Sequence, residues 1–462
     1  MMPLPYPPGP KGHWFLGNLR AYTGDPLGYP QLCARDFGDV VALRIGPRRV
    51  YLIMHPDPIE EVLVTNNRNF KKDFTIRFYR PILGNGLLSS EGDLWLRQRR
   101  LVQPAFLKSR IAAYGDVMVS YTERMLSKWR DGQTLDIHAE FMRLALEIAA
   151  KTLFDTEVDE GTYEIGSALE IALHCIDNRF TGAFWLPYWV PTANNRALHQ
   201  AVARLDHILY QIIAQRRRST KDRGDLLSIL LQARDGNDGG RMTDRQLRDE
   251  AMTLLLAGHE TTALALSWTW YLLAQHPAVM AKLQSEVDNV LGSREPTVTD
   301  LPQLRYTEWV VTEGMRLYPP AYAMVRETIQ DCELFGYRVP ARTTLFLTQW
   351  VVHHDARFFT DPDEFQPERW ADGLAQRLPK YAYFPFGGGP RQCIGNTFAM
   401  MEATLVLAAM AQRVSMALDP NHEVRLWPSI TLRPAYGIRA AINRRHEVPE
   451  KIRATSIAQL AT

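Results

Sequence analysis

The sequence Phe386-Gly-Gly-Gly-Pro-Arg-Gln-Cys-Ile-Gly395 brings three glycines, a proline and a cysteine together. The glycines and the proline predict a tight turn whose backbone can come very close to a flat ligand. Residues 396–414 continue with apolar side chains at helical spacing, which predicts a helix. Cys393 therefore lies where a turn enters a helix, and the unpaired N–H groups and positive dipole there favour a thiolate. A thiolate in this position is a good ligand for iron.

The other cysteines do not suggest a metal cluster. Cys33, Cys175 and Cys332 are widely separated and form no CxxC pair, which argues against a zinc or iron–sulfur site. Scattered thiols also suit a reducing compartment. The alternative interpretation of Cys393 is a buried, inert cysteine after a glycine-rich turn.

The composition indicates one large globular protein. Of the 462 residues, 46% are hydrophobic and 23% are charged, and no linker, low-complexity run or repeat divides the chain. We therefore expect a single domain over residues 1–462. The net charge of +2 gives no general argument for nucleic-acid binding. The N-terminus has neither a signal-peptide pattern nor an apolar run of about 20 residues that could act as a membrane anchor.

The pattern Phe386-x-x-Gly389-x-Arg391-x-Cys393-x-Gly395 resembles the haem-binding loop of the cytochrome P-450 family. The resemblance implies a mainly α fold with small β sheets, a long central helix over one haem b, and Cys393 as the iron ligand. The further positions that it places around the haem are Leu87, Pro385, Phe386, Ile394, Gly395 and Ala399.

Several basic and aromatic residues match the family's haem-propionate ligands. Trp95 and Arg99 are four residues apart on a predicted helix and share one face. A tryptophan packed on an arginine stem at the surface is the ordinary explanation, but the pair also matches the family motif for one propionate. Arg326 is placed like the family arginine for the second propionate, and Arg391 supplies further donors.

A long apolar helix is predicted from about Thr243 to Gln275. Thr243 and Gln246 fit a capping box at its start. The helix is apolar nearly all round, which is typical of a core helix in a large protein. Glu260 in its middle argues against a membrane span, because a charge at bilayer depth is costly.

The centre of this helix, Ala257-Gly258-His259-Glu260-Thr261, carries the expected catalytic residues. The small residues at 257 and 258 let the helix approach a porphyrin closely. The Thr261 hydroxyl can bond to the i−4 carbonyl and open a groove for water, and Glu260 is a candidate proton source. A threonine pair idle in a helix is the alternative. His259 is not expected to bind iron.

Glu313 and Arg316 lie three residues apart on a predicted helix over residues 305–318 and are flanked by apolar residues. A buried pair of this kind needs a further partner, and Arg369, in the sequence Pro-Glu-Arg-Trp, would supply it. The combination matches the structural triad of the family. We therefore expect a scaffold for the cysteine loop rather than a catalytic role.

The remaining segments are expected to form short strands and pocket walls. Strands are predicted at 40–45 and 50–53, from Pro320 to about 347, and near Ile430 and Ala440. The irregular connection 66–90 would roof the pocket, and residues 179–195 form either a lid or a packed corner. The expected pocket residues are Leu88, Leu254, Ala257, Tyr322, Ala323, Met324 and Ile430. They suit fatty acids, terpenoids, steroids or aromatics, and a carboxylate anchor at Arg49 or Tyr51 is a further hypothesis.

The resulting prediction is a monooxygenase that inserts one atom of O₂ into a lipophilic substrate. We expect its electrons from a ferredoxin or flavodoxin with its reductase, docking near the basic residues Arg97, Arg100, Arg377 and Lys380. The N-terminal sequence predicts a soluble, cytoplasmic, bacterial-type monomer. One alternative is a peroxygenase, which would lack the acid–alcohol pair. Another is a haem-based gas sensor, which usually carries a signalling or DNA-binding module that this sequence does not contain.

Overall fold

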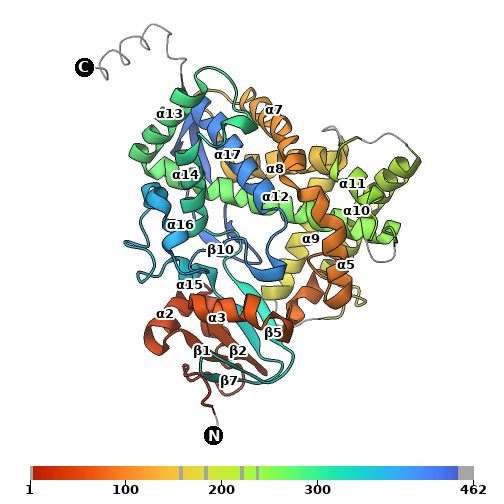
Figure 1. The fold of residues 1–462 in the computed structure, drawn as a ribbon, viewed down its shortest axis with the longest axis vertical. Helices are drawn as coiled ribbons and strands as arrows, with labels where there is room; N and C mark the ends of the chain where they lie inside the picture. Colours follow the sequence, from red (N-terminus) through yellow and green to blue (C-terminus); the bar gives the residue numbers. More distant parts are fainter. Residues whose placement is uncertain (1–3, 156–159, 182–185, 219–222, 236–238, 446–462) are drawn as a thin grey trace.

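The computed structural model describes residues 4–155, 160–181, 186–218, 223–235 and 239–445. The larger part of the molecule is helical, and a smaller β-rich part lies at the end near the N-terminus (Figure 1). Most helices share one hydrophobic core, whereas the main sheet contributes to a second core. The glycine-rich loop runs between the two, because Phe384 belongs to the sheet core and Phe386 packs against the helical core.

The long helices predicted from sequence are confirmed to within a few residues. Their bounds and those of the shorter α-helices are α1 Leu19–Gly24, α2 Gly28–Phe37, α3 Pro56–Glu60, α4 Arg80–Leu83, α5 Gly92–Val102, α6 Lys108–Ala112, α7 Gly115–Leu126, α8 Ile137–Phe154, α9 Glu160–Thr181, α10 Ala193–Arg218, α11 Leu226–Gln232, α12 Asp244–Gln275, α13 Pro277–Leu291, α14 Arg305–Leu317, α15 Gln349–His353, α16 Leu374–Arg377 and α17 Asn396–Arg413. Within the described ranges, no helix is long and apolar enough to cross a membrane.

The main sheet has five strands in the order β1-β2-β8-β5-β3. Their bounds are β1 Val40–Ile45, β2 Arg48–Ile53, β3 Phe70–Lys71, β5 Met324–Thr328 and β8 Thr344–Leu347. Strand β2 pairs antiparallel with β1, with Val41 opposite Leu52, and parallel with β8, with Leu52 opposite Phe346. Because β5 pairs with β8, the sheet joins the N-terminal strands to the segment that carries Arg326.

The remaining strands form one three-stranded sheet and two hairpins. The sheet has the order β4-β12-β9, with β4 Thr134–Asp136, β9 Val414–Leu418 and β12 Arg439–Arg444. The hairpins pair β6 Cys332–Leu334 with β7 Tyr337–Val339, and β10 Leu426–Pro428 with β11 Leu432–Pro434. The strand expected near Ile430 is therefore displaced, because Ile430 occupies the turn between β10 and β11.

Two further predictions needed adjustment. The turn between β1 and β2 is shorter than expected, since β2 begins at Arg48 and only Gly46 and Pro47 separate the strands. Residues 66–90 are irregular as predicted, but they include β3, two 3₁₀ turns and α4. The connection is therefore ordered, as predicted, but it contains more regular secondary structure than expected.

Helix α12 runs through the middle of the molecule (Figure 1) and begins with the predicted capping box between Thr243 and Gln246. From Leu247 to Trp270, all its residues are buried except Ala257, Gly258 and Thr261. These three residues belong to the segment that the sequence assigned to oxygen chemistry. The core helix therefore has a single unburied stretch, at the predicted position.

Candidate active site

The glycine-rich loop has the tight geometry that its sequence predicts. Gly387 and Gly389 have φ values of +67° and +65°, in the region that favours glycine. A Cβ at Gly389 would lie 1.9 Å from the carbonyl oxygen of Leu63. A Cβ at Gly388 would lie 2.1 Å from the ring of Tyr381. The glycines are thus needed for packing against the protein itself, and not only for the approach of a flat ligand.

The Cys393 thiol lies at the end of this loop. Its backbone N–H donates to the carbonyl of Phe386 at 2.9 Å, which closes the turn. The Cys393 side chain is exposed, whereas the other described cysteines are buried or half-buried. Desolvation by surrounding protein raises the pKa of the thiol, and it outweighs the Gly395 N–H and the charge of Arg99, which lower it. The surroundings of Cys393 therefore do not by themselves favour the thiolate, and a bound metal cation would favour it.

The residues present fit a haem, the group that the resemblance implies. The exposed thiol lies in the loop that leads into α17, and α17 packs against α12. On α12, a Cβ added to Gly258 would meet nothing within 4 Å, and Ala257 is exposed in an otherwise buried stretch. A soft ligand and a helix face of small residues are the two features that a flat iron porphyrin requires.

Arg391 is half-buried and Arg326 is buried, and both are the cations expected to bind propionates. The Arg391 guanidinium lies 4.2 Å from the Trp95 ring centroid, and its Nη1 donates to the carbonyl of Ser90 at 3.0 Å. Arg326 is buried and donates to its neighbouring Val325 carbonyl at 2.9 Å. Burial, followed by the charge of Arg391, lowers the pKa of Arg326 to about 10. Arg391 already has one ionic partner, because its Nη2 pairs with the Glu91 carboxylate, so a propionate bound here would share this cation with Glu91.

Lys72 joins this cation group and was not predicted from sequence. Burial lowers the pKa of its ammonium to about 7, with further lowering by Arg391 and Arg326. Glu91 and Glu250 act in the opposite direction. The sequence carries no local signal for this role, because Lys72 lies in the charged stretch Lys71-Lys72-Asp73, which is typical of a solvated segment.

Trp95 and Arg99 do not act as a matched pair. The Trp95 ring stacks against Arg391, as described above, whereas Arg99 Nη1 donates to the Gln392 carbonyl at 3.0 Å. Arg99 therefore holds the cysteine loop against α5 and places a positive charge near Cys393. The assignment of both residues to a propionate stays a prediction.

Thr261 and Glu260 occupy different environments. The Thr261 hydroxyl donates to the Ala257 carbonyl at 2.6 Å, which is the i−4 bond predicted from sequence. Glu260 is buried and accepts from the Thr431 hydroxyl at 2.5 Å and from Arg433 Nε at 2.6 Å. The Glu260 carboxylate is therefore held by residues of the β10–β11 hairpin and does not contact Thr261.

The ion pair of Glu260 extends to a second carboxylate. Arg433 Nη1 contacts Asp177 Oδ2 of α9 at 3.0 Å, so one guanidinium bridges two acids. Burial raises the pKa of Asp177 to about 6, against the opposing effect of Arg433. Sequence analysis missed Asp177, Thr431 and Arg433, because none of them belongs to a local motif.

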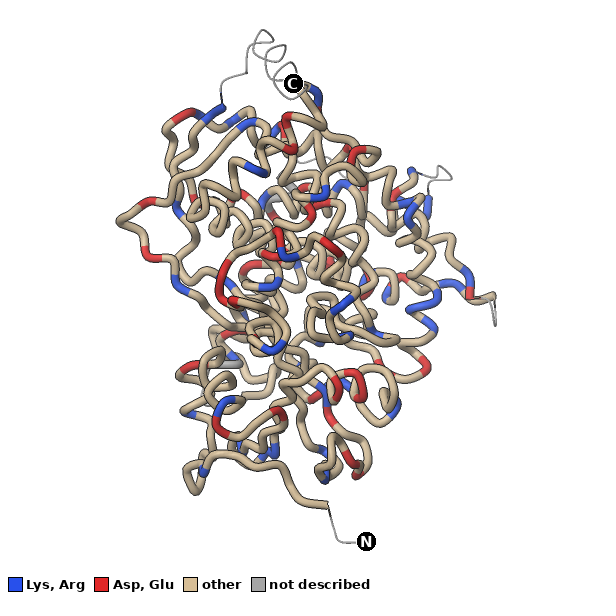
Figure 2. The backbone as a smooth tube through the Cα atoms, turned by 60° about the vertical axis from the view of Figure 1, so that its left-hand side comes forward, with Lys and Arg blue, Asp and Glu red and all other residues tan. Residues whose placement is uncertain are grey.

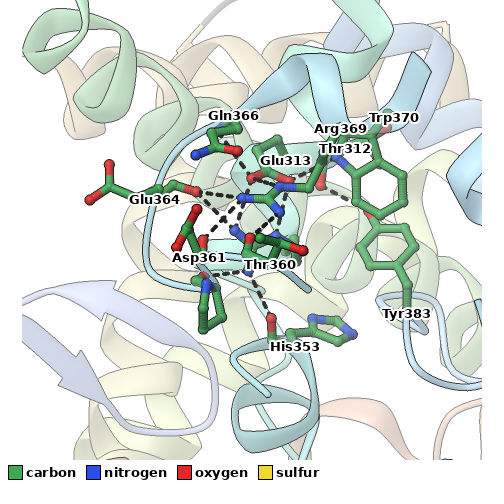
Figure 3. Close-up of polar contacts among 12 residues, drawn as sticks. Thr312, Glu313, His353, Thr360, Asp361, Glu364, Gln366, Arg369, Trp370 and Tyr383 are labelled. Atoms are coloured by element: carbon green, nitrogen blue, oxygen red, sulfur yellow. Dashed lines mark hydrogen bonds and ion pairs between the residues drawn. The ribbon is translucent and has the colours of Figure 1, made fainter. Parts of the chain in front are cut away.

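The predicted scaffold triad is assembled as expected (Figure 3). Arg316 donates to Glu313 through Nε at 2.9 Å and Nη2 at 2.8 Å, and Arg369 Nε donates to Glu313 Oε1 at 2.8 Å. Trp370, which was not predicted, donates its indole N–H to Glu313 Oε2 at 2.8 Å. Glu313 and Arg316 are fully buried, so the carboxylate is satisfied by three side chains in a water-free interior.

The triad is connected to the cysteine loop through the residues that precede it. Arg316 Nη1 donates to the His353 carbonyl at 2.8 Å, and His353 Nε2 accepts from the Phe384 N–H at 3.1 Å. The Tyr383 hydroxyl donates to the Thr312 carbonyl at 3.0 Å (Figure 3). These contacts fix the chain two and three residues before Phe386, which supports the predicted scaffold role.

The predicted pocket residues are only partly accessible. Leu88 is 42% exposed, whereas Leu254 is buried in the helical core at 8%. The Tyr322 hydroxyl donates to the Ser429 carbonyl at 2.7 Å, which ties the segment before β5 to the β10–β11 turn. Within the aromatic stretch predicted as a lid or corner, residues 182–185 lie outside the described part of the chain.

Two further hypotheses concern Tyr51 and His259. Tyr51 is 1% exposed, its ring packs into the sheet core, and its hydroxyl donates to the Arg338 carbonyl at 3.3 Å. Arg49 is exposed and lines the same pocket as Tyr51, so the carboxylate anchor at Arg49 or Tyr51 stays a prediction. His259 is buried, and its Nε2 lies 2.9 Å from the Met142 carbonyl, in agreement with the expectation that it binds no iron.

Comparison with known proteins gives a consistent result. A family model described as Cytochrome P450 matches residues 7–435. Cyclooctatin synthase of Streptomyces melanosporofaciens is 41% identical over 86% of each chain. Pentalenene oxygenase of Streptomyces avermitilis is 36% identical over 84% of this chain and 86% of its own. The crystal structure of the cytochrome P450DA heme domain superimposes with a TM-score of 0.87 at 26% identity, covering 96% of this chain and 99% of the other.

Proposed function

The chain belongs to the cytochrome P450 family and is a haem-thiolate monooxygenase, and from this premise we propose that its substrate is a terpenoid. The observation that carries the proposal is the identity of 36–41% to enzymes named cyclooctatin synthase, cyclooctat-9-en-7-ol 5-monooxygenase and pentalenene oxygenase. The predicted pocket residues are mostly apolar, which suits a hydrocarbon skeleton. The more general alternatives, fatty acids and steroids, have no comparable support.

The haem b proposed as cofactor would be held from both sides. Cys393 would bind the iron, while Arg391, Arg326 and Lys72 would neutralise the propionates. When bound, the haem supplies the chemistry that activates dioxygen and inserts one of its atoms into a substrate C–H bond. The Trp95 ring and the Ser90 carbonyl fix the Arg391 guanidinium, so this donor is oriented before any ligand arrives.

The chain's own contribution to proton delivery rests on Thr261 and Glu260. Since the Thr261 hydroxyl donates to Ala257, its oxygen is left to accept a hydrogen bond from a water molecule. Glu260 is held by Arg433 and must release this contact before it can carry a proton towards Thr261. Asp177 contacts the same guanidinium and can retain it when Glu260 turns away. Proton delivery by Glu260 is thus controlled by the competition of Glu260 and Asp177 for the Arg433 guanidinium.

We propose that electrons arrive from a ferredoxin or flavodoxin with its reductase, at the surface around α5. The basic residues expected there are less available than the sequence suggested. Arg97 and Arg100 both pair with Asp235, at 3.0 and 3.4 Å, and Lys380 pairs with Glu60 at 3.0 Å. Figure 2 shows acidic and basic positions interspersed along the visible chain. Electrostatic steering of the partner is therefore expected to be modest.

Ligand titration of the purified holoenzyme tests the substrate class. We expect pentalenene to shift the haem spin state at lower concentration than a straight-chain fatty acid or a steroid of similar mass. Tighter binding of the fatty acid would contradict the terpenoid proposal and leave the family assignment intact. The expectations of a cytoplasmic location, a monomer and a single domain stay predictions, and no observation favours the peroxygenase or the gas sensor.

A further inference from the structure

Two adjacent acidic residues of α12 hold the backbone of the roof segment, residues 82–90. Asp249 Oδ2 accepts from the Asn85 N–H at 2.8 Å, and Glu250 Oε2 accepts from the Leu87 N–H at 3.0 Å. Both carboxylates are buried, with exposures of 4% and 0%. Buried carboxylates are costly unless they are hydrogen-bonded. Their use on backbone N–H groups of one irregular segment therefore requires an explanation.

A neighbouring residue extends the same attachment. Arg248 Nη1 donates to the Ile82 carbonyl at 2.6 Å, and its Nε donates to Asp206 of α10 at 2.6 Å. At its other side the segment is tied to α5, because Gln98 Nε2 donates to the Asn85 carbonyl at 2.8 Å. The segment is thus fixed between three helices and is not a loosely attached lid.

The roof sequence is built for this close approach. A Cβ at Gly86 would lie 2.1 Å from the Thr253 hydroxyl and 2.5 Å from the Asp249 carbonyl oxygen. A Cβ at Gly84, whose φ is +52°, would lie 2.1 Å from Asp249 Oδ1. Glycine at both positions lets the segment lie directly on α12. The contact is therefore encoded on both partners.

The outcome of these contacts is the placement of one side chain. Lys72 Nζ contacts the carbonyl of Leu88 and lies 3.5 Å from that of Leu87, so the peptide is held from the other side as well. Leu87, Ser89 and Ser90 are buried, whereas Leu88 is 42% exposed. Of these four consecutive residues, only Leu88 has an exposed side chain on the fixed backbone.

We propose that Glu250, assisted by Asp249, is a positioning residue that fixes the Leu88 side chain and thereby selects the substrate carbon that is oxidised. This proposal rests on the monooxygenase function of the site. Selection among inequivalent C–H bonds depends on displacements of about 1 Å at the reacting centre. A backbone held by charge-assisted hydrogen bonds can maintain that precision, whereas an irregular segment without them could shift between conformations.

Hydrogen exchange of the holoenzyme tests the contact itself. In Glu250→Leu, exchange of peptides covering residues 83–90 should become faster by roughly tenfold or more, because the Leu87 N–H loses a charge-assisted partner. Burial raises the pKa of Glu250 to about 7, so the exchange is measured at pH 8, where the carboxylate form prevails. Glu250→Gln keeps an acceptor oxygen and should stay within about threefold of the wild type.

Asp244→Asn is the matched control for these exchange measurements. Asp244 is an exposed carboxylate on the same helix and pairs with Arg217 rather than with the roof. This variant should leave the exchange of residues 83–90 unchanged. Equal exchange in Glu250→Leu and the wild type would overturn the proposal without touching the family assignment, which the CO spectrum of the same samples checks. If Glu250→Leu does not fold, Asp249→Ala, which removes the acceptor of Asn85, serves in its place.

Product analysis tests the functional part. With pentalenene as the probe, the ratio of oxidised isomers should change several-fold in Glu250→Leu and return to the wild-type value in Glu250→Gln. If Glu250 acts through Leu88, the change should be much smaller in a Leu88→Ala background, since coupled residues are not additive. An unchanged isomer ratio, or full additivity of the two substitutions, would reduce Glu250 to a structural residue. If pentalenene is not oxidised, the same isomer ratio is measured with the terpenoid that shifts the haem spin state at the lowest concentration.

Discussion

Cys393 shows how a single residue depends on its ligand. Cys393 is exposed, yet desolvation raises the pKa of its thiol. The N–H of Gly395 and the charge of Arg99 lower this pKa and would moderate the charge on a metal-bound sulfur. Iron ligation by Cys393 stays a prediction, which the next experiment tests.

Replacement of Cys393 by serine should abolish thiolate ligation. The reduced wild-type protein with CO is expected to show the red-shifted Soret band typical of a thiolate ligand, and Cys393→Ser should lose it. Cys175→Ser, at a buried cysteine in α9, is the control and should keep the band. A normal CO spectrum in Cys393→Ser would contradict the assignment.

Thr261→Ala should separate oxygen consumption from product formation. Without the hydroxyl, a proton-donating water is no longer positioned, and positioned proton transfer is typically worth about 10²–10⁴-fold. We expect product formed per NAD(P)H consumed to fall and hydrogen peroxide to rise. Thr262→Ala, at the buried neighbouring position, is the control. Fully coupled turnover in Thr261→Ala would favour the peroxygenase alternative.

Lys72 gives a prediction for the pH dependence of stability in the haem-free protein. Its pKa is lowered to about 7 in the folded chain, whereas an unfolded lysine titrates near ~10.4. Between these values the unfolded chain binds more protons, so the free energy of unfolding should rise with pH from about 7 towards 10.

The measurement is the urea midpoint of wild type and Lys72→Met at pH 7, 8 and 9. The slope should be smaller in Lys72→Met by on the order of 1 kcal/mol per pH unit. Identical slopes would show that the protonation of Lys72 does not change when the chain unfolds. Glu250, whose pKa is raised to about 7, contributes mainly below this window, so the slope between pH 8 and 9 reports Lys72 best.

At the scale of elements, α14 carries the scaffold on which the cysteine loop rests. One carboxylate, Glu313, satisfies Arg316, Arg369 and Trp370, and Arg316 in turn fixes the backbone of residues 353–364. A buried network of this kind fixes one conformation only while each member is satisfied. The position of the cysteine loop is therefore fixed by contacts of residues that lie outside the loop.

Glu313→Gln should destabilise the fold strongly. It leaves two buried guanidinium groups without a counter-charge, and breaking a buried pair typically costs about 3–5 kcal/mol. The urea midpoint and the haem retained after gel filtration should both fall. Glu308→Gln, an exposed carboxylate on the same helix, should be neutral. Full haem retention with an unchanged midpoint in Glu313→Gln would argue against the scaffold role.

At the scale of the whole molecule, the surface charge bears on electron delivery. The net charge of +2 and the pairing of Arg97 and Arg100 with Asp235 indicate weak local fields rather than a strong basic patch. Exposed pairs are also screened at physiological salt. Recognition of a redox partner should therefore depend on shape as well as charge.

Reduction by an acidic ferredoxin should slow only moderately with salt. We expect the rate to fall about tenfold or less between 50 and 300 mM ionic strength, because few charges are available for steering. Arg97→Glu should slow reduction and flatten the salt dependence. Lys282→Glu on α13, which pairs with Glu368, is the control. A rate independent of both salt and Arg97 would place the docking surface elsewhere.

The sequence by itself determined the family, the main helices and the residues of contiguous motifs. The cysteine loop, the capping box at Thr243 and the Glu313–Arg316 pair are each encoded within a few residues, so local geometry and spacing suffice to recognise them. The Thr261 bond to Ala257 belongs to the same class, because the helix alone brings the two groups together.

Only the tertiary structure decided which distant residues complete the site. The hydrogen-bonded residues Glu250 and Leu87 are 163 positions apart in the sequence, and Arg433 and Glu260 are 173 apart. Neither pair produces a local sequence pattern. Lys72 and Tyr51 make the same point, since the half-buried Lys72 lies under the influence of Arg391 and Arg326, whereas the Tyr51 ring packs into the sheet core. The burial of a residue and its choice of partner arise from the packing of segments that are remote in sequence. The spacing of neighbouring residues does not determine this packing.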